Sequence, residues 1–348
     1  GEAWSVIKWA TQKDLEPVIR RLLATGVDPT RHEMNTAIFV AAEHGRLGII
    51  KLFLTHGVKV ELRNNGSETP TMLFCAAEQG HELVIRLLLA EGADPNILNY
   101  DGHTALMAAV SGGHQATVEL LLENGASVDI VGRWGETPLS VAVRSGHNSL
   151  VRLFVRISPR THLEIRHDEE TPLAQAISKG WTRIVIILLE AGVDIHREDG
   201  FGHTPLWHAA SSGCLEIVQL LLAVDSSEIY MRPAVDAAFQ GGHAEVFAYL
   251  LDNNAPLELD LDGKLPLQVA TERHHTALAK LLIERDLFVS EEHSPNGSSP
   301  LRWAVTHGDA EIVYKLLELG HGKGNVPSSY WPLYYAVLRA DTEIIARL

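Results

Sequence analysis

An alanine recurs along this chain at intervals of 29 to 35 residues. It occupies eleven positions: Ala10, Ala41, Ala76, Ala109, Ala142, Ala176, Ala209, Ala238, Ala270, Ala304 and Ala336. An aliphatic residue stands three residues before every one of them, from Ile7 to Leu333. A small residue at one phase of a repeat near 33 residues predicts stacked units in which one helix lies too close to its neighbour for a larger side chain. Such a stack presents an extended surface and does not enclose one reaction centre.

Each repeat carries signals for two helices. Thr137, Thr171 and Thr204 each open a Thr-Pro-Leu string, which predicts a threonine N-cap followed by proline in the first helical turn. A left-handed glycine is expected after the first helix, at Gly45, Gly80, Gly113, Gly146, Gly180, Gly213, Gly242 and Gly308. The second helix is expected to end at a left-handed residue in Gly26, Gly57, Gly92, Gly125, Gly192, Gly320, Asp225, Asn254 or Asp286.

A turn, here called a finger, precedes each first helix, and Asp101-Gly102 and Asp262-Gly263 are the expected hairpin tips. The strings Gly102-His103-Thr104-Ala105-Leu106 and Gly202-His203-Thr204-Pro205-Leu206 resemble ankyrin repeats, and the resemblance extends over essentially the whole chain. It implies an all-α, curved solenoid of stacked helix-turn-helix units with β-hairpin or turn fingers. The family histidine that follows Thr-Pro-Leu is replaced in every repeat, for example by Trp207, while the packing positions are kept.

We expect residues 1–348 to form a single elongated domain of about eleven repeats, the first degenerate and the last truncated, within a longer parent chain. Three places break the period. Thr69-Pro70 predicts a small insertion, the stretch from Ser158 to Thr161 replaces the usual Gly-Ala step, and the interval of 29 residues before Ala238 predicts a shortened finger. These breaks are either neutral changes in surface loops or bends that create a central pocket.

Composition restricts the partner. The net charge is −15 and no run of Lys or Arg occurs, which argues against nucleic acid or an anionic membrane. A protein partner with a basic patch is expected. No apolar stretch approaches the roughly 20 residues needed to span a bilayer, and no signal peptide opens the chain. Cys75 and Cys214 lie four repeats apart and are expected to stay reduced, which predicts an intracellular protein, cytoplasmic or nuclear.

The finger tips and the outer side of the first helices are the surface that this fold leaves for a partner. Aromatic and arginine residues, which dominate binding hot spots, are concentrated at these positions. The expected partner-binding residues are Tyr100, Asp101, His103, Arg133, Trp134, Glu136, His167, Asp168, Phe201, His203, Trp207, Tyr230 and Arg232. Packing of Trp134, Phe201 and Tyr230 between adjacent fingers is the alternative interpretation.

An enzymatic role would depend on the polar residues of the central fingers. His167, the acidic run from Asp168 to Glu170, and His203 could supply acid–base groups, but a charged turn before a helix explains the run more simply. Histidines at one phase indicate a structural role, since one per layer does not converge on a metal; these are His81, His114, His147, His243 and His275.

No phosphate-binding glycine loop, His-Glu-x-x-His, Cys-x-x-Cys or Gly-x-Ser-x-Gly string occurs. The sequence therefore predicts a noncatalytic protein–protein interaction module, with no metal and no cofactor, that binds on its concave face. A sensor or scaffold segment of a larger protein, similar to innate-immunity receptors, is the alternative. A small-molecule ligand in the central repeats stays open.

Overall fold

The computed structural model describes residues 2–30, 35–61, 70–257, 266–285, 287 and 310–318. It divides into two compact units, residues 1–202 (unit 1) and 203–348 (unit 2), which are described separately. A search of the described residues for a helix long and apolar enough to cross a membrane finds none. The expectation of a single domain of about eleven repeats stays a prediction.

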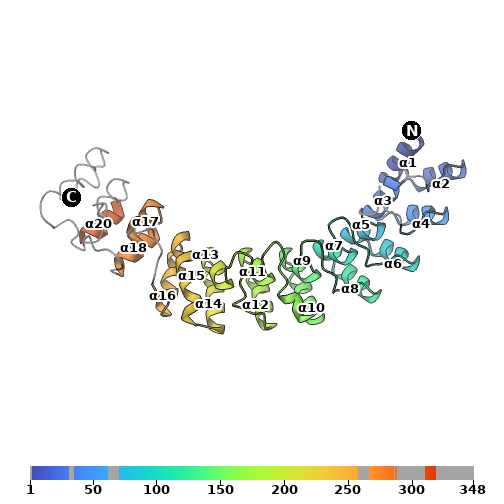
Figure 1. Ribbon diagram of the computed structural model, residues 1–348. Helices are drawn as coiled ribbons and strands as arrows, with labels where there is room; N and C mark the ends of the chain where they lie inside the picture. The colour runs from blue at the N-terminus through green and yellow to red at the C-terminus, as the bar shows by residue number, and fades with distance from the viewer. Residues whose placement is uncertain are drawn as a thin grey trace. The chain divides into compact units, whose positions relative to one another are not determined.

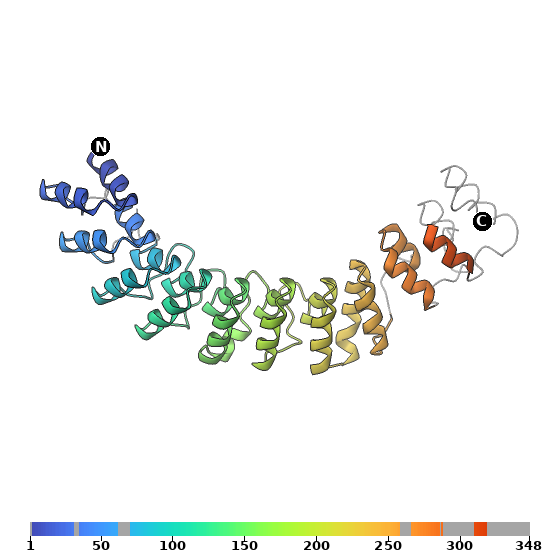
Figure 2. The ribbon, with the colours of Figure 1, turned by 180° about the vertical axis from the view of Figure 1, so that it is seen from behind.

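The helices of unit 1 come in antiparallel pairs that form two layers (Figure 1; Figure 2). The first helices contact one another in order, α1 with α3, α3 with α5, and so on to α9 with α11, while α2, α4, α6 and α8 do the same in the second layer. The helices are α1 (Glu2–Gln12), α2 (Glu16–Ala24), α3 (Asn35–Glu43), α4 (Leu47–Thr55), α5 (Met72–Glu78), α6 (Glu82–Ala90), α7 (Ala105–Ser111), α8 (Gln115–Glu123), α9 (Pro138–Arg144), α10 (Asn148–Ile157), α11 (Pro172–Ser178) and α12 (Thr182–Glu190).

Unit 2 continues the same construction. Helix α13 packs on α15, α14 on α16, α16 on α18 and α18 on α20. Its described helices are α13 (Pro205–Ser211), α14 (Leu215–Val224), α15 (Glu228–Gly241), α16 (Ala244–Asp252), α17 (Pro266–Glu272), α18 (Thr276–Glu284) and α20 (Ala310–Glu318). The all-α fold expected from the repeat is confirmed.

The periodic alanines form the centre of the core. Every one from Ala10 to Ala270 is completely buried, with an exposed fraction of 0%. The aliphatic residues three positions earlier, from Ile7 to Leu267, are buried as well. Ala304 and Ala336 lie outside the described residues. The close approach of neighbouring first helices that the alanines predict is therefore confirmed for the described repeats.

The expected helix caps are present. The hydroxyls of Thr137, Thr171 and Thr204 accept the backbone N–H three residues later, at 3.1 to 3.2 Å. The glycines that follow the first helices, from Gly45 to Gly242, are all left-handed, with φ between 67° and 75°. Gly308, Asp286 and Gly320 lie outside the described residues.

The left-handed ends expected at Gly26, Gly57, Gly92, Gly125, Gly192 and Asn254 are present, while α10 ends at the extended Ser158. Asp225 is the exception, because its backbone is extended, with φ −148°. The expected left-handed conformation of Asp225 is therefore wrong. Its carboxylate accepts the N–H of Ser227 at 2.9 Å, and the next helix begins at Glu228, so the chain turns by a side-chain hydrogen bond and needs no left-handed step.

The shortened repeat contains no finger. Helix α15 is extended to 14 residues and occupies the stretch where a finger tip was expected. Tyr230 and Arg232 are consequently helical residues, which corrects their expected position on a tip. The Ser158–Thr161 break falls at a short 3-10 helix, η2 (Arg160–Leu163), and Thr69 of the expected insertion lies outside the described residues.

The fingers are turns held by few backbone hydrogen bonds. One of these turns carries an antiparallel β bridge, between His167 and Glu170. At the Asp101-Gly102 tip, the N–H of Asn99 donates to the carbonyl of His103 at 3.0 Å, and Gly102 has φ 79°. Asp262-Gly263 lies outside the described residues.

The phased histidines bind one repeat to the one before it. His81, His114, His147 and His243 each stand at the start of a second helix and donate from Nε2 to a carbonyl of the preceding repeat, at 2.8 to 3.2 Å. A Cβ on Gly80 would meet the His114 ring at 2.7 Å. Gly80 therefore allows the left-handed turn and leaves room for the ring, and the structural role predicted for these four histidines is confirmed. The ring of His275, the fifth, lies against Gly242 in the same way.

Candidate interaction site

The aromatic residues expected on the fingers of unit 1 are exposed. Tyr100 is 58% exposed, Trp134 61% and Phe201 69%. Most of each ring faces solvent, which disfavours the alternative interpretation that Trp134 and Phe201 pack between fingers. Asp101, Arg133 and Asp168 are exposed too.

Arg133 joins two neighbouring fingers. Its guanidinium carbon lies 4.7 Å from the centroid of the Tyr100 ring, within the range of a cation–π contact. Its backbone N–H donates to the carbonyl of Asp101 at 3.3 Å. Arg133 thus supports the Tyr100 tip and remains exposed at the same time.

Glu136 and His167 are buried, each 4% exposed, which corrects their expected exposure to a partner. One carboxylate oxygen of Glu136 lies 3.3 Å from Nε2 of His103 and 3.2 Å from Nε2 of His167. The other accepts the backbone N–H of Trp134 at 2.9 Å. A single buried carboxylate therefore connects three successive fingers beneath the exposed Trp134 ring. His103 is half-buried in the same cluster.

Two residues that were missed from the sequence hold His167 in place. Arg144, at the end of α9, places its Nη1 3.1 Å from His167 Nε2. Gln175 of α11 donates from its amide to the His167 carbonyl at 3.1 Å and is 6% exposed. The available signal was Gln175 itself, a polar residue on a helix whose neighbours Ala174 and Ala176 are buried.

The pKa of Glu136 lies below its ordinary value. Burial raises the pKa, but hydrogen bonds from the N–H groups of Glu136 and Trp134, together with the His103 contact, outweigh it. The carboxylate is therefore ionised at neutral pH. The stability that its ionised form contributes is present above the ordinary pKa of 4.5 and is lost as the pH falls through the folded-state pKa.

The free energy of unfolding is expected to fall as the pH is lowered from 7.5 to about 5.5, in part through His162. Burial in η2 lowers the pKa of His162 from its ordinary 6.5, although Asp129 partly opposes the shift. Below pH 6.5 the unfolded chain therefore binds more protons at this site than the folded chain. Denaturant titrations at both pH values should show a weaker pH dependence for His162→Gln. The exposed His44→Gln is the control, and an equal change in both variants would contradict the assignment.

A pocket of about 360 Å³ opens between two fingers of unit 1, lined by Trp134, Arg166, Asp168 and Glu169. Asp168 and Glu169 are both left-handed, with φ 49° and 67°, and form the two-residue tip of the His167–Glu170 bridge. Paired left-handed residues define a type I′ turn, where asparagine and glycine are preferred. Two acidic residues therefore occupy positions at which the backbone conformation favours asparagine or glycine.

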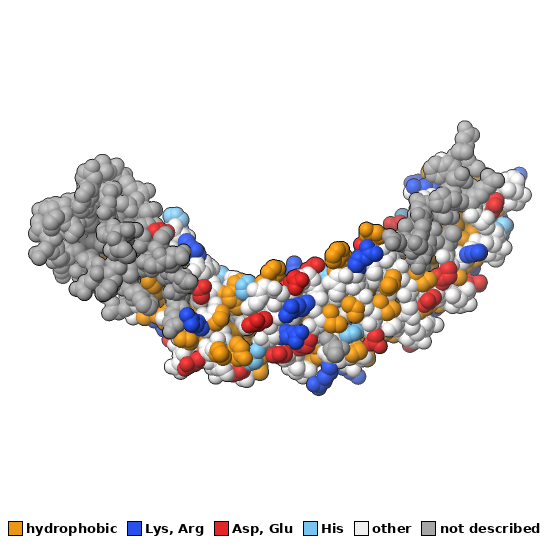
Figure 3. Space-filling model, viewed as in Figure 1, with side chains coloured by type: hydrophobic (Ala, Val, Ile, Leu, Met, Phe, Trp, Pro, Cys, Tyr) orange, Lys and Arg blue, Asp and Glu red, His pale blue; other side chains and the backbone are white. Residues whose placement is uncertain are grey.

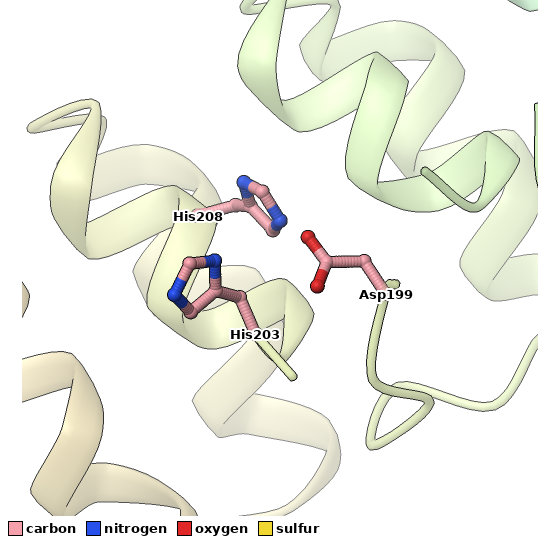
Figure 4. A group of neighbouring side chains, drawn as sticks. All are labelled: Asp199, His203 and His208. Atoms are coloured by element: carbon pink, nitrogen blue, oxygen red, sulfur yellow. The ribbon is translucent and has the colours of Figure 1, made fainter. Parts of the chain in front are cut away.

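Two of the expected site residues of unit 2, His203 and Trp207, lie at the start of α13. The His203 ring stacks on Trp207, with centroids 3.6 Å apart and an angle of 3°, and His208 meets Trp207 edge-on at 5.2 Å. Figure 4 shows His203 and His208, the latter on the helix and the former just before it. His203 and Trp207 are half-buried. On α15, Arg232 is exposed and Tyr230 half-buried.

Both cysteines are free thiols. Burial, followed by the charges of Glu78 and Glu43, raises the pKa of Cys75 to about 12. The Cys75 thiol therefore stays protonated at neutral pH and is a poor nucleophile. On the face seen in Figure 3, acidic, basic and hydrophobic side chains intermingle over the described residues.

Comparison with known proteins identifies the repeat. The chain matches the family described as ankyrin repeats (3 copies) over residues 7–99, 73–162 and 157–232. It is 27% identical to rabankyrin-5 of Mus musculus over 187 residues, covering 53% of this chain and 14% of that protein. It is 30% identical over 156 residues to a probable E3 ubiquitin-protein ligase, XBOS32, of Oryza sativa subsp. japonica, covering 43% of this chain and 31% of that protein.

A third relative, the ankyrin repeat and KH domain-containing protein mask-1 of Caenorhabditis elegans, is 27% identical over 154 residues, 43% of this chain and 6% of that protein. The chain thus spans less than a third of the length of these relatives. The matched segments and the stacked helix pairs define the class: the chain belongs to the ankyrin-repeat family. Ankyrin repeats generally act in protein binding and are generally noncatalytic.

Proposed function

We propose that this chain is a noncatalytic module that binds a protein partner on its finger tips and first helices. The observation that carries the proposal is the row of exposed aromatic rings on the fingers of unit 1, Tyr100, Trp134 and Phe201. Large aromatic side chains bring contact area at low cost in conformational entropy and are enriched in binding hot spots. Their exposure in the free chain means that a partner can reach them without rearrangement.

The scaffold beneath the row supports the same function. The Glu136 cluster and the Arg133–Tyr100 contact connect neighbouring fingers, so the exposed rings are held at defined positions. A surface that is already ordered loses little conformational freedom on binding, which favours affinity. The net charge of −15 favours a partner with a basic patch over nucleic acid, and the free thiols fit an intracellular setting.

The proposal is tested by capture from a native lysate on the chain itself, followed by measurement of affinity for the proteins identified. The Trp134→Ala/Phe201→Ala variant should bind a genuine partner about tenfold or more weakly. Leu83→Ala is the matched control, since Leu83 is 67% exposed on α6, away from the fingers. If the unmodified chain, the double variant and Leu83→Ala all bound every captured partner with equal affinity, the proposed binding face would be contradicted.

A second candidate function is that of a sensor or scaffold segment inside a larger protein. The observation that favours it is that this chain matches only 6% to 31% of the length of rabankyrin-5, XBOS32 and mask-1. Sequencing the parent transcript distinguishes the two functions, because a scaffold segment requires a further effector or nucleotide-binding domain on the same chain.

A further inference from the structure

The pocket between the Trp134 finger and the Asp168-Glu169 finger carries a more specific inference, which rests on the proposed function. Its walls combine an indole ring, 61% exposed, with Arg166 and the acidic residues Asp168 and Glu169 of the neighbouring finger. Aromatic faces and carboxylates both attract cations, the first through the ring quadrupole and the second through charge. We propose that this pocket receives an arginine side chain from an extended segment of the partner protein.

The chain itself contains a related contact one finger earlier. There the Arg133 guanidinium lies over the Tyr100 ring. An arginine recurs 33 residues later as Arg166, but its Nη2 donates to the carbonyl of Glu198 at 2.9 Å. Among the described residues, no arginine or lysine forms an ion pair with Asp168 or Glu169. The Trp134 pocket therefore offers an aromatic face and two negative charges that a cation from another molecule can use.

Contacts with neighbouring residues fix the tip that carries the two carboxylates. Glu169 accepts the N–H of Gly200 at 2.8 Å through its carbonyl, and its carboxylate lies against Gly200, where a Cβ would clash with it. Asp168 Oδ2 lies 3.6 Å from His167 Nδ1. A Cβ on Gly135 would likewise clash with the carbonyl of Arg166, so the two fingers meet closely beside Trp134.

The left-handed conformations of Asp168 and Glu169 agree with a binding role. A non-glycine residue in this region costs roughly 1 kcal/mol or more, and asparagine or glycine would relieve it. Acidic side chains occupy both positions of the tip in spite of that cost. Arginine suits the pocket better than lysine, because its planar guanidinium can stack on the Trp134 indole while its fork of N–H groups reaches both carboxylates.

The test is a titration of the full chain with N-acetyl-arginine amide as the probe. The NMR signal of the Trp134 indole N–H reports binding, and the Trp134→Phe variant assigns that signal. A saturable shift with a Kd on the order of millimolar is expected, because the probe supplies a single side chain. N-acetyl-citrulline amide, which has nearly the same shape without the charge, should cause no saturable shift.

The Asp168→Asn/Glu169→Gln variant should weaken binding of the probe by about tenfold. Glu123→Gln/Glu190→Gln removes the same number of charges from exposed positions on the second helices α8 and α12 and should leave the affinity unchanged. The proposal is overturned by equal shifts with citrulline, by equal or tighter binding of N-acetyl-lysine amide, by equal weakening in both double variants, or by no saturation with the arginine probe. If a captured partner is lost by Trp134→Ala/Phe201→Ala but retained by Asp168→Asn/Glu169→Gln, the arginine pocket fails while the proposed function stands.

Discussion

Glu136→Ala is expected to lower the free energy of unfolding of this chain by about 3 kcal/mol. The substitution removes both carboxylate oxygens, and these oxygens contact His103, His167 and the backbone N–H of Trp134 in a buried cluster. Buried groups that lose their hydrogen-bond partners keep the full cost of leaving water. Because the cluster spans three fingers, we expect amide hydrogen exchange to accelerate in all three, around residues 99–103, 132–136 and 166–170.

The matched control for this prediction is Glu164→Ala. Glu164 Oε1 also connects neighbouring repeats, accepting the N–H of Asp194 at 2.9 Å, but this hydrogen bond is exposed to solvent. Its loss should cost about 1 kcal/mol or less. Urea titrations followed by circular dichroism compare the two variants with the unmodified protein. Similar costs for Glu136→Ala and Glu164→Ala would show that the buried cluster contributes no more than an ordinary surface hydrogen bond.

Ala209→Leu is the second large prediction, with an expected loss of about 1–3 kcal/mol or more. Ala209 is completely buried on α13, which packs directly on α15. Three additional heavy atoms must force the helices apart or adopt strained rotamers. The control is Ala223→Leu, at an exposed position of α14 in the same unit, which should change stability by no more than about 0.5 kcal/mol. Equal denaturation midpoints for both variants would contradict the assigned role of the alanine.

Much of the fold was predictable because its signals are local or strictly periodic. The buried alanines, the threonine caps and the left-handed glycines each depend on one residue type at a repeated position. Asp225 was mispredicted because the conformation of a helix end depends on the element that comes next in the chain. Here a new helix begins at Glu228 in place of a finger. The same absence of a finger put Tyr230 and Arg232 on a helix.

The site was less predictable, since its contacts join residues about one repeat apart. The exposure of Tyr100, Trp134 and Phe201 agrees with their tip positions. Glu136 and His167 occupy comparable positions in sequence but are buried, because each finds a polar partner in a neighbouring finger. From sequence alone a charged side chain is predicted to be exposed, and only the structure shows the partner that allows it to be buried.

The histidine bond between repeats has an evolutionary consequence. The same imidazole-to-carbonyl bond connects the repeats of His81, His114, His147 and His243 to those before them. A gene duplication or deletion of one whole period preserves the bond on both sides of the junction, whereas a partial period breaks it. Other residues replace the histidine in four of the described repeats, namely Leu15, Arg46, Trp181 and Cys214, and Trp181 instead places its ring against Gly146. The array can thus lengthen or shorten by whole periods, while the repeats that lack the histidine are less interchangeable than those that carry it.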